Sequence, residues 1–118
     1  MEAFARKEGF ALRDAFAEDA IWRVPGSGVM SGTYRGRSEI FRFLGRLPKL
    51  TGGTYRSAVV DVLASETRAA GLYRAQGERE GRTIDIEQLL LFTIAGGVVT
   101  EVLALPSDPA AFEAFWAP

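Results

Sequence analysis

The sequence predicts an α+β fold in which short helices pack against an antiparallel sheet. Three observations support this prediction: an apolar stripe at helical spacing near residue 43, a series of apolar and β-branched runs after residue 55, and glycine- and proline-rich turns between the runs. Successive runs without helices between them favour an antiparallel meander over repeated β-α-β units. A chain of 118 residues is expected to form a single domain, residues 1–118, that buries roughly two-thirds of its unfolded surface.

The first elements are expected to be short helical pieces followed by a strand. Residues 1–16 are compatible with two such pieces, and Glu18 and Asp19 are expected to close the second. Residues 20–24 have the aromatic and β-branched content of a strand. The loop at 25–28 contains a proline and two glycines, which are typical of the end of a strand.

A longer helix is predicted for Ser38–Leu47. Apolar residues recur there at helical spacing and give the helix one apolar face, which is expected to pack on the sheet. Ser38 is the expected N-cap, with Glu39 in the positively charged first turn. Pro48 is expected to end the helix.

Four strands and a final helix are predicted for the rest of the chain. The strands are Tyr55–Ala64, Ala69–Glu80, Arg82–Ile94 and Val98–Leu105, with turns at Gly81 and Ala95–Gly97. Ser107 and Asp108 are N-cap residues, and Pro109 follows them at the first helical position. The short helix that begins there is expected to carry Phe112, Phe115 and Trp116.

The composition excludes several kinds of site. The chain has no cysteine and no histidine, so disulfides, thiolate chemistry and the commonest general base and metal ligand are ruled out. No metal site or cofactor is predicted, and any acid–base chemistry has to use carboxylates, tyrosine, lysine or arginine. The net charge of −1 gives no case for a nucleic-acid or membrane partner. No apolar run of ~20 residues and no signal peptide is visible, so a cytoplasmic location is expected.

Alternation along residues 83–92 predicts which side chains face the helices. Odd positions carry Asp85 and Glu87, so the even positions are expected to point inward. The inward set is Ile84, Ile86, Gln88, Leu90 and Phe92. Leu89 and Leu91 then lie on the outer face, where something is expected to cover them. The last strand offers two rows between which alternation does not choose: Val98, Thr100, Val102 and Ala104, or Val99, Glu101, Leu103 and Leu105.

Three stretches in order carry a family resemblance: F-A-E-D-A-x-W-x-V-P-G at 16–26, G-T-Y-x-G-R at 32–37 and D-P-x-A-F-E-A-F-W at 108–116. By these the chain resembles the SnoaL-like branch of the nuclear transport factor 2-like superfamily, which includes ketosteroid isomerase-like and polyketide cyclase-like proteins. The resemblance implies a cone-shaped, curved antiparallel sheet wrapped around short helices, a truncated first helix, and a homodimer formed through the outer sheet face. It also implies that Trp22, Val24, Gly71, Tyr73, Ala75 and the row Val99, Glu101, Leu103 and Leu105 point inward.

The catalytic residues of the resembled enzymes are mostly missing. Ketosteroid isomerases use a carboxylate base and a tyrosine with a protonated carboxylic acid as oxyanion donors. The resemblance places Val24 at the base position and Gln88 at the acid position, and the tyrosine would lie before Met1. Arg74 and Asp85 could supply part of the Asp–Arg–Asp group of similar epoxide hydrolases, but both are expected to point outward. The histidine that often assists the cyclases has no counterpart.

Alternation and resemblance together predict a cavity that binds a small, mostly apolar, ring-containing molecule. Its predicted lining is Trp22, Val24, Phe43, Leu44, Tyr73, Gln88, Leu90 and Leu103. Core filling is the alternative for Trp22, while Tyr73 and Gln88 either make internal hydrogen bonds or bind a ligand. The set contains no lysine or arginine, so anionic ligands are disfavoured.

Glu101 is the candidate catalytic residue. It could be exposed near the Gly96-Gly97 turn, it could bond to a backbone N–H or pair with Arg23, or it could face the cavity with a raised pKa and exchange protons. Three functions stay open for the whole chain: a proton-transfer enzyme of isomerase, cyclase or hydrolase type, a ligand-binding protein without turnover, or a dimerisation module whose cavity is filled by its own side chains.

Overall fold

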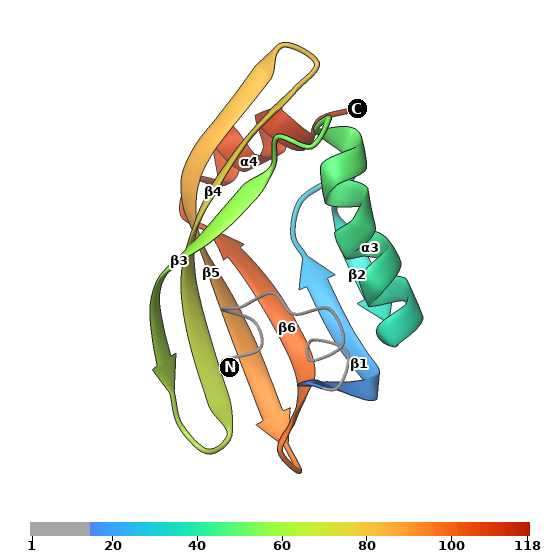
Figure 1. Ribbon diagram of the computed structural model, residues 1–118, viewed down its shortest axis with the longest axis vertical. Coiled ribbons are helices and arrows are strands. Elements are labelled where there is room, and N and C mark those ends of the chain that lie inside the picture. Colours follow the sequence, from blue (N-terminus) through green and yellow to red (C-terminus); the bar gives the residue numbers. More distant parts are fainter. Residues whose placement is uncertain (1–14) are drawn as a thin grey trace.

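A computed structural model describes residues 15–118, which form one curved sheet with two helices on its concave side (Figure 1). The strands are β1 (Phe16–Val24), β2 (Gly32–Arg35), β3 (Arg56–Ala64), β4 (Arg68–Arg79), β5 (Arg82–Ala95) and β6 (Val98–Pro106). The helices are α3 (Arg37–Leu50) and α4 (Pro109–Trp116). Helix α3 packs against β1 and β2, and α4 packs against β5. The predicted α+β fold, with a curved sheet around short helices, is confirmed.

The sheet has the strand order β2-β1-β6-β5-β4-β3 and remains open. Four of the five neighbouring pairs are antiparallel, as predicted, whereas β1 runs parallel to β6. These two strands lie far apart in the sequence, so no short turn between them requires an antiparallel arrangement.

The N-terminal part of the sheet differs from the prediction. Strand β1 begins at Phe16, so Glu18 and Asp19 lie within a strand and do not close a helix. Both side chains are exposed, and the pairing with β6 shifts register between Phe16 and Ile21, which marks a bulge. The short strand β2 was not predicted, and it pairs antiparallel with β1. The helical pieces expected before residue 15 lie outside the described residues.

Helix α3 starts earlier and ends later than predicted. Gly36, at a φ of +85°, occupies the N-cap, and Ser38 lies inside the helix. The Glu39 carboxylate instead accepts a hydrogen bond from the backbone N–H of Arg35 at 3.0 Å. Pro48 does not end the helix, which continues to Leu50. Because Pro48 lies in the last turn, its missing N–H removes a single backbone hydrogen bond and the helix is not broken.

The strands after residue 55 and helix α4 are confirmed within one or two residues. Asp108 caps α4, because its carboxylate accepts from the backbone N–H of Ala111 at 3.0 Å, and Pro109 follows it. No helix within residues 15–118 is long and apolar enough to cross a membrane.

A bulge in β6 decides which of its side chains reach the core. Thr93 pairs with Glu101 while its neighbour Ile94 pairs with Val99, so Thr100 is an extra residue in β6. After the bulge, each residue of β6 points to the opposite face from the one that alternation counted from Val99 would give. Neither predicted row therefore stays on one face along the whole strand. Val99, Val102 and Ala104 are buried on the concave face. Glu101, Leu103 and Leu105 lie on the outer face, so their predicted inward placement is wrong.

Candidate functional site

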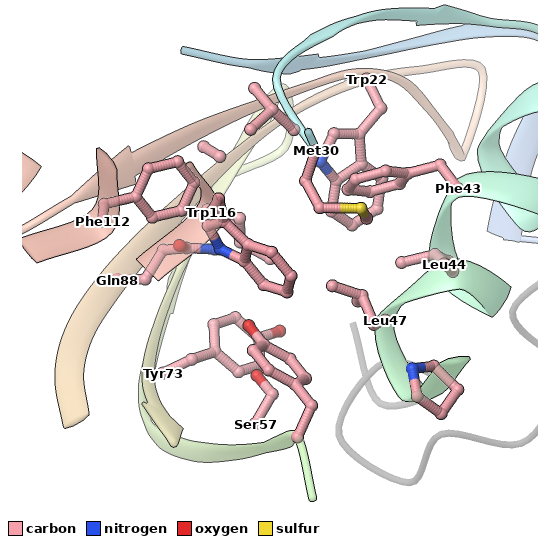
Figure 2. Close-up of a pocket in the computed structure, with 15 residues that line it drawn as sticks. Trp22, Met30, Phe43, Leu44, Leu47, Ser57, Tyr73, Gln88, Phe112 and Trp116 are labelled. Atoms are coloured by element: carbon pink, nitrogen blue, oxygen red, sulfur yellow. The ribbon is translucent and has the colours of Figure 1, made fainter. Parts of the chain in front are cut away.

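A cavity of about 390 Å³ lies between the concave face of the sheet and the two helices (Figure 2). Its walls come from β1, the β1–β2 loop, α3, β3, β4, β5, β6, α4 and the segment before β3. The lining residues are Trp22, Val24, Met30, Phe43, Leu44, Leu47, Pro48, Tyr55, Ser57, Tyr73, Gln88, Leu90, Ala104, Phe112 and Trp116.

Small residues along β4 leave the space for this cavity. Between residues 69 and 77 the inward positions of β4 carry Ala69, Gly71, Ala75 and Gly77, and Tyr73 is the single large side chain among them. An alanine at position 71 would place its Cβ 2.5 Å from Cε2 of Tyr73, so the phenol ring lies over the bare backbone of Gly71. These small side chains leave open space above the concave face of β4, and the Tyr73 ring lies across part of that space.

Helix α3 supplies an apolar wall. Figure 2 shows Phe43, Leu44 and Leu47 facing the cavity from this helix. The ring of Phe43 packs against Trp22 with centroids 5.6 Å apart, and against Tyr34 at 4.3 Å. The apolar stripe predicted from helical spacing thus faces both the sheet and the cavity.

Helix α4 supplies the opposite wall, with Phe112 and Trp116, and polar contacts fix it in place. The Trp116 carbonyl accepts from the backbone N–H of Val29 at 2.7 Å. The Glu113 carboxylate accepts from the N–H and the hydroxyl of Ser27 at 3.0–3.2 Å. At the far end, the Arg79 guanidinium donates to the carbonyls of Phe115 and Ala117 at 3.1 and 2.9 Å. Cationic groups at a helix C-terminus satisfy its unpaired carbonyls.

The polar side chains of the cavity come from adjacent strands. Tyr73 on β4 pairs directly with Gln88 on β5, and Ser57 on β3 pairs with Ala75, two residues from Tyr73 on the same face. Within the described residues, neither the Tyr73 hydroxyl nor the Gln88 amide makes a side-chain hydrogen bond, and the same is true of the Tyr55 hydroxyl. Figure 2 shows Ser57, Tyr73 and Gln88 on the sheet side of the cavity, across from Leu44 and Leu47.

Burial keeps the two tyrosine hydroxyls of the cavity protonated. It raises the pKa of Tyr55 from its ordinary value to about 12, and it also raises the pKa of Tyr73. The described residues that line the cavity include no aspartate, glutamate, lysine or arginine. Residues 15–118 contain no group of three carboxylates arranged to hold a metal ion. Within residues 15–118, the cavity lining offers neutral hydrogen-bond donors and acceptors and no group that titrates near neutral pH.

Seven of the eight predicted binding residues line this cavity: Trp22, Val24, Phe43, Leu44, Tyr73, Gln88 and Leu90. Leu103 does not, because it lies on the outer face opposite Leu91. That a molecule binds there stays a prediction.

Glu101, the catalytic candidate, also lies away from the cavity. Its carboxylate accepts from Nε of Arg23 at 3.1 Å, and both side chains are about two-fifths exposed. Of the three alternatives, the structure shows the pair with Arg23. Arg74 and Asp85 form a two-point ion pair at 2.8 Å on the outer face, as their outward prediction implied. No carboxylate of these pairs reaches the cavity.

Sequence reasoning missed eight lining residues: Met30, Leu47, Pro48, Tyr55, Ser57, Ala104, Phe112 and Trp116. Some had a signal. Phe112 and Trp116 are four apart on the last helix, which puts them on one face. Ser57 shares the inward face of neighbouring strands with Tyr73, but only the strand register shows this. Met30 lies in a loop, where no periodicity applies.

The fold and this cavity define a class of small α+β proteins with a curved, open sheet, and comparison with known proteins gives the family. The SnoaL-like domain family matches residues 1–102. The Mycobacterium tuberculosis protein named "Uncharacterized protein Rv0034" is 34% identical over 116 residues, which are 98% of this chain and 88% of that protein. The structure of Bal32a from a soil-derived mobile gene cassette is 31% identical with a TM-score of 0.88, covering 98% of this chain and 88% of that one. A Xanthomonas campestris protein with a cystatin-like fold is 28% identical with a TM-score of 0.85, covering 99% and 92%. The chain belongs to the SnoaL-like domain family.

Proposed function

We propose that this SnoaL-like protein binds a small, uncharged, mostly apolar, ring-containing molecule in its cavity. The observation that carries the proposal is the cavity itself, which measures about 390 Å³ and has mainly aromatic and aliphatic walls, with no charged group among its described lining residues. Small-molecule sites usually measure ~300–1,000 Å³ and have apolar walls with a few polar groups. A charged ligand would lose its hydration there and gain no counter-charge.

Binding without turnover fits the lining better than proton-transfer catalysis does. General acid–base catalysis needs a group whose pKa lies near the working pH. The base position of ketosteroid isomerases is Val24, which lines the cavity, and the hydroxyls of Tyr55 and Tyr73 hold their protons well above neutral pH. A dimerisation module with a filled interior is less well supported, because the open volume is large enough for a ligand.

The two tryptophans of the chain provide a direct test. Trp22 and Trp116 both line the cavity, so their intrinsic fluorescence should change when a ligand enters. N-phenyl-1-naphthylamine, an uncharged fluorophore with two ring systems, should bind with a saturable signal, and 1-naphthyl phosphate should not. Equal affinity for the phosphate, or no binding of uncharged aromatic probes, would contradict the proposal.

A matched pair of alanine substitutions locates the binding. Ala104 lies on the cavity wall and is buried, whereas Ala58 lies opposite Arg74 on the outer face and is exposed. Ala104→Leu should fill part of the cavity and weaken probe binding, while Ala58→Leu should leave it unchanged. Native mass spectrometry of the purified protein would also show whether a molecule is carried through purification, and its mass.

We also propose a homodimer that forms through the outer face of the sheet. Leu89 pairs with Leu105, and Leu91 pairs with Leu103, so four leucines form one apolar patch, the outer leucine patch. Leu105 is 42% exposed in the single chain. If the row Val99, Glu101, Leu103 and Leu105 pointed inward, as the resemblance implies, Val102 would extend this surface, but it is buried on the concave face. A cytoplasmic location stays a prediction of the sequence.

A further inference from the structure

We propose that Tyr73 and Gln88 together bind an oxygen acceptor of the ligand, such as a ring ketone or quinone carbonyl, and that Gly71 positions the Tyr73 phenol for this contact. The inference rests on the proposed function and adds the chemical group that the cavity recognises. Tyr73 and Gln88 are binding residues in this account, and Gly71 is a positioning residue.

The register of the sheet brings the two polar side chains together. Tyr73 and Gln88 are directly opposite each other on β4 and β5, and both point to the concave face. Directly opposed residues have Cβ atoms ~4.5–5.5 Å apart, so one ligand that lies against this part of the sheet can contact both side chains. Figure 2 shows both side chains at the cavity wall formed by the sheet.

The Tyr73 hydroxyl lies at the cavity, and no described residue forms a hydrogen bond with it. The residue is 5% exposed, and no hydrogen bond to its hydroxyl is formed within the described residues. Fully buried side-chain polar atoms of the described residues all have partners, so this hydroxyl must reach the open space of the cavity. A tyrosine hydroxyl removed from water normally finds a partner. A ligand in the cavity would supply it.

Gly71 determines where that hydroxyl lies. The Cβ of an alanine at position 71 would be 3.0 Å from the Tyr73 hydroxyl oxygen and 2.5 Å from Cε2. The phenol therefore runs along β4 and lies over the glycine. Any side chain at this position would push the phenol away and move its hydroxyl.

The available groups favour an acceptor oxygen over a donor on the ligand. The Tyr73 hydroxyl keeps its proton because burial raises its pKa, and the Gln88 amide carries two N–H donors. A carbonyl oxygen has two lone pairs and can accept from both side chains at once. The rest of the wall is apolar and suits the ring that bears the carbonyl.

Two probes of matched shape test the contact. 2-Acetylnaphthalene carries a ketone oxygen, and 2-isopropenylnaphthalene replaces that oxygen with a methylene group. The protein should bind the ketone roughly tenfold more tightly than the hydrocarbon, the gain expected from one or two hydrogen bonds that form out of water. Calorimetry or tryptophan fluorescence measures both dissociation constants.

Substitutions then assign the preference to the residues. Tyr73→Phe should reduce the ketone preference to near unity without changing hydrocarbon affinity, and Gln88→Leu should reduce it in part. Gly71→Ala should also lower the preference while both donors remain in the chain. Gly45→Ala is the control, because an alanine Cβ there meets nothing within 4 Å and the residue does not line the cavity. Thermal melting checks that each variant is folded.

The outcomes separate this inference from the proposed function. Equal binding of ketone and hydrocarbon by the natural protein overturns the donor pair and leaves the apolar cavity site intact. If Tyr73→Phe weakens the binding of both probes equally, the donor pair is overturned as well, because the Tyr73 side chain then contributes packing and no hydrogen bond to the ketone. An unchanged ketone preference in Gly71→Ala overturns the positioning role of Gly71. Failure of both probes to bind contradicts the proposed function itself.

Discussion

The concave and outer faces of the sheet use polar side chains in different ways. On the outer face the charged groups bond to one another: Arg74 pairs with Asp85, and Arg23 pairs with Glu101. On the concave face the described polar groups that line the cavity are uncharged, and the hydroxyl of Tyr73 and the amide of Gln88 have no partner within the described residues. The same strands carry both arrangements, because successive side chains point to opposite faces.

This difference shows where a ligand would act. An exposed ion pair satisfies itself and contributes little to stability or recognition. A neutral polar group at the wall of a cavity, without a protein partner, can still form a hydrogen bond with a ligand. The outer face therefore presents leucines framed by satisfied charges, which suits a protein partner, and the concave face suits a small molecule.

The largest expected effect on the free energy of unfolding comes from substituting Phe92 or Leu91, which are neighbours on opposite faces of β5. Phe92 is 0% exposed on the concave side, and Leu91 belongs to the outer leucine patch. Phe92→Ala should lower the free energy of unfolding by roughly 3–5 kcal/mol, since it removes a buried ring. Leu91→Ala should cost about 1 kcal/mol in the monomer. Urea unfolding measures both, and equal costs would contradict the assignment of faces.

The second prediction concerns the outer leucine patch. Leu89→Glu would bury a charge against the facing copy, so the dimer should weaken by roughly a hundredfold or more. Ala58→Glu is the control, because it adds the same charge to the outer face opposite Arg74, away from the patch. Sedimentation velocity at micromolar concentration should show dimers for the natural protein and the control, and monomers for Leu89→Glu. A monomeric natural protein would remove the proposed interface.

Most of the fold could be predicted from the sequence, and the misses have local causes. Strict alternation in β5 predicted its faces correctly, because no bulge interrupts its pairing with β4. In β6 one extra residue, Thr100, exchanged the faces, and a bulge leaves no clear mark on the apolar pattern. Pro48 misled the prediction of the helix end, since a proline in the last turn costs little.

The cavity was partly predictable for the same reasons. Seven predicted residues lie on elements with clear periodicity, and they line the cavity. The two errors, Glu101 and Leu103, are the residues that the β6 bulge turned outward. The role of Gly71 could not be seen in the sequence, because it depends on the direction of the Tyr73 ring over the backbone. Only tertiary structure gives that direction.

The third prediction concerns alkaline pH and the cavity wall. An unfolded tyrosine loses its proton near 10.0, whereas burial raises the pKa of Tyr55 to about 12 in the folded protein. Between these values the unfolded chain binds fewer protons, so stability should fall as pH rises, by about 1.4 kcal/mol per unit of pKa difference. Below pH 10 the ionisation of this tyrosine should not change the free energy of unfolding.

Tyr55→Phe removes the group and keeps its ring contact with Trp116, whose centroid lies 6.0 Å away. The variant should therefore unfold at higher pH than the natural protein while matching it at neutral pH. Tyr34→Phe is the comparison, because the Tyr34 hydroxyl donates to the Met30 carbonyl at 2.7 Å and its loss should destabilise at neutral pH too. Equal alkaline unfolding of Tyr55→Phe and the natural protein would show that Tyr55 is not buried in solution.

The smallest expected effect belongs to Glu101, and it tests the comparison of faces most directly. Glu101→Gln breaks an ion pair whose two side chains are 40% and 43% exposed, and such pairs contribute about 0–1 kcal/mol to stability. The variant should melt within a few degrees of the natural protein and bind N-phenyl-1-naphthylamine with unchanged affinity, because the carboxylate does not reach the cavity. Arg23→Gln should behave alike, since it removes the other half of the same pair. If Glu101→Gln altered probe affinity while Arg23→Gln did not, the glutamate would act on the cavity independently of its pair. Strand β6 would then have to present Glu101 and Leu103 inward in solution, as the family resemblance implies.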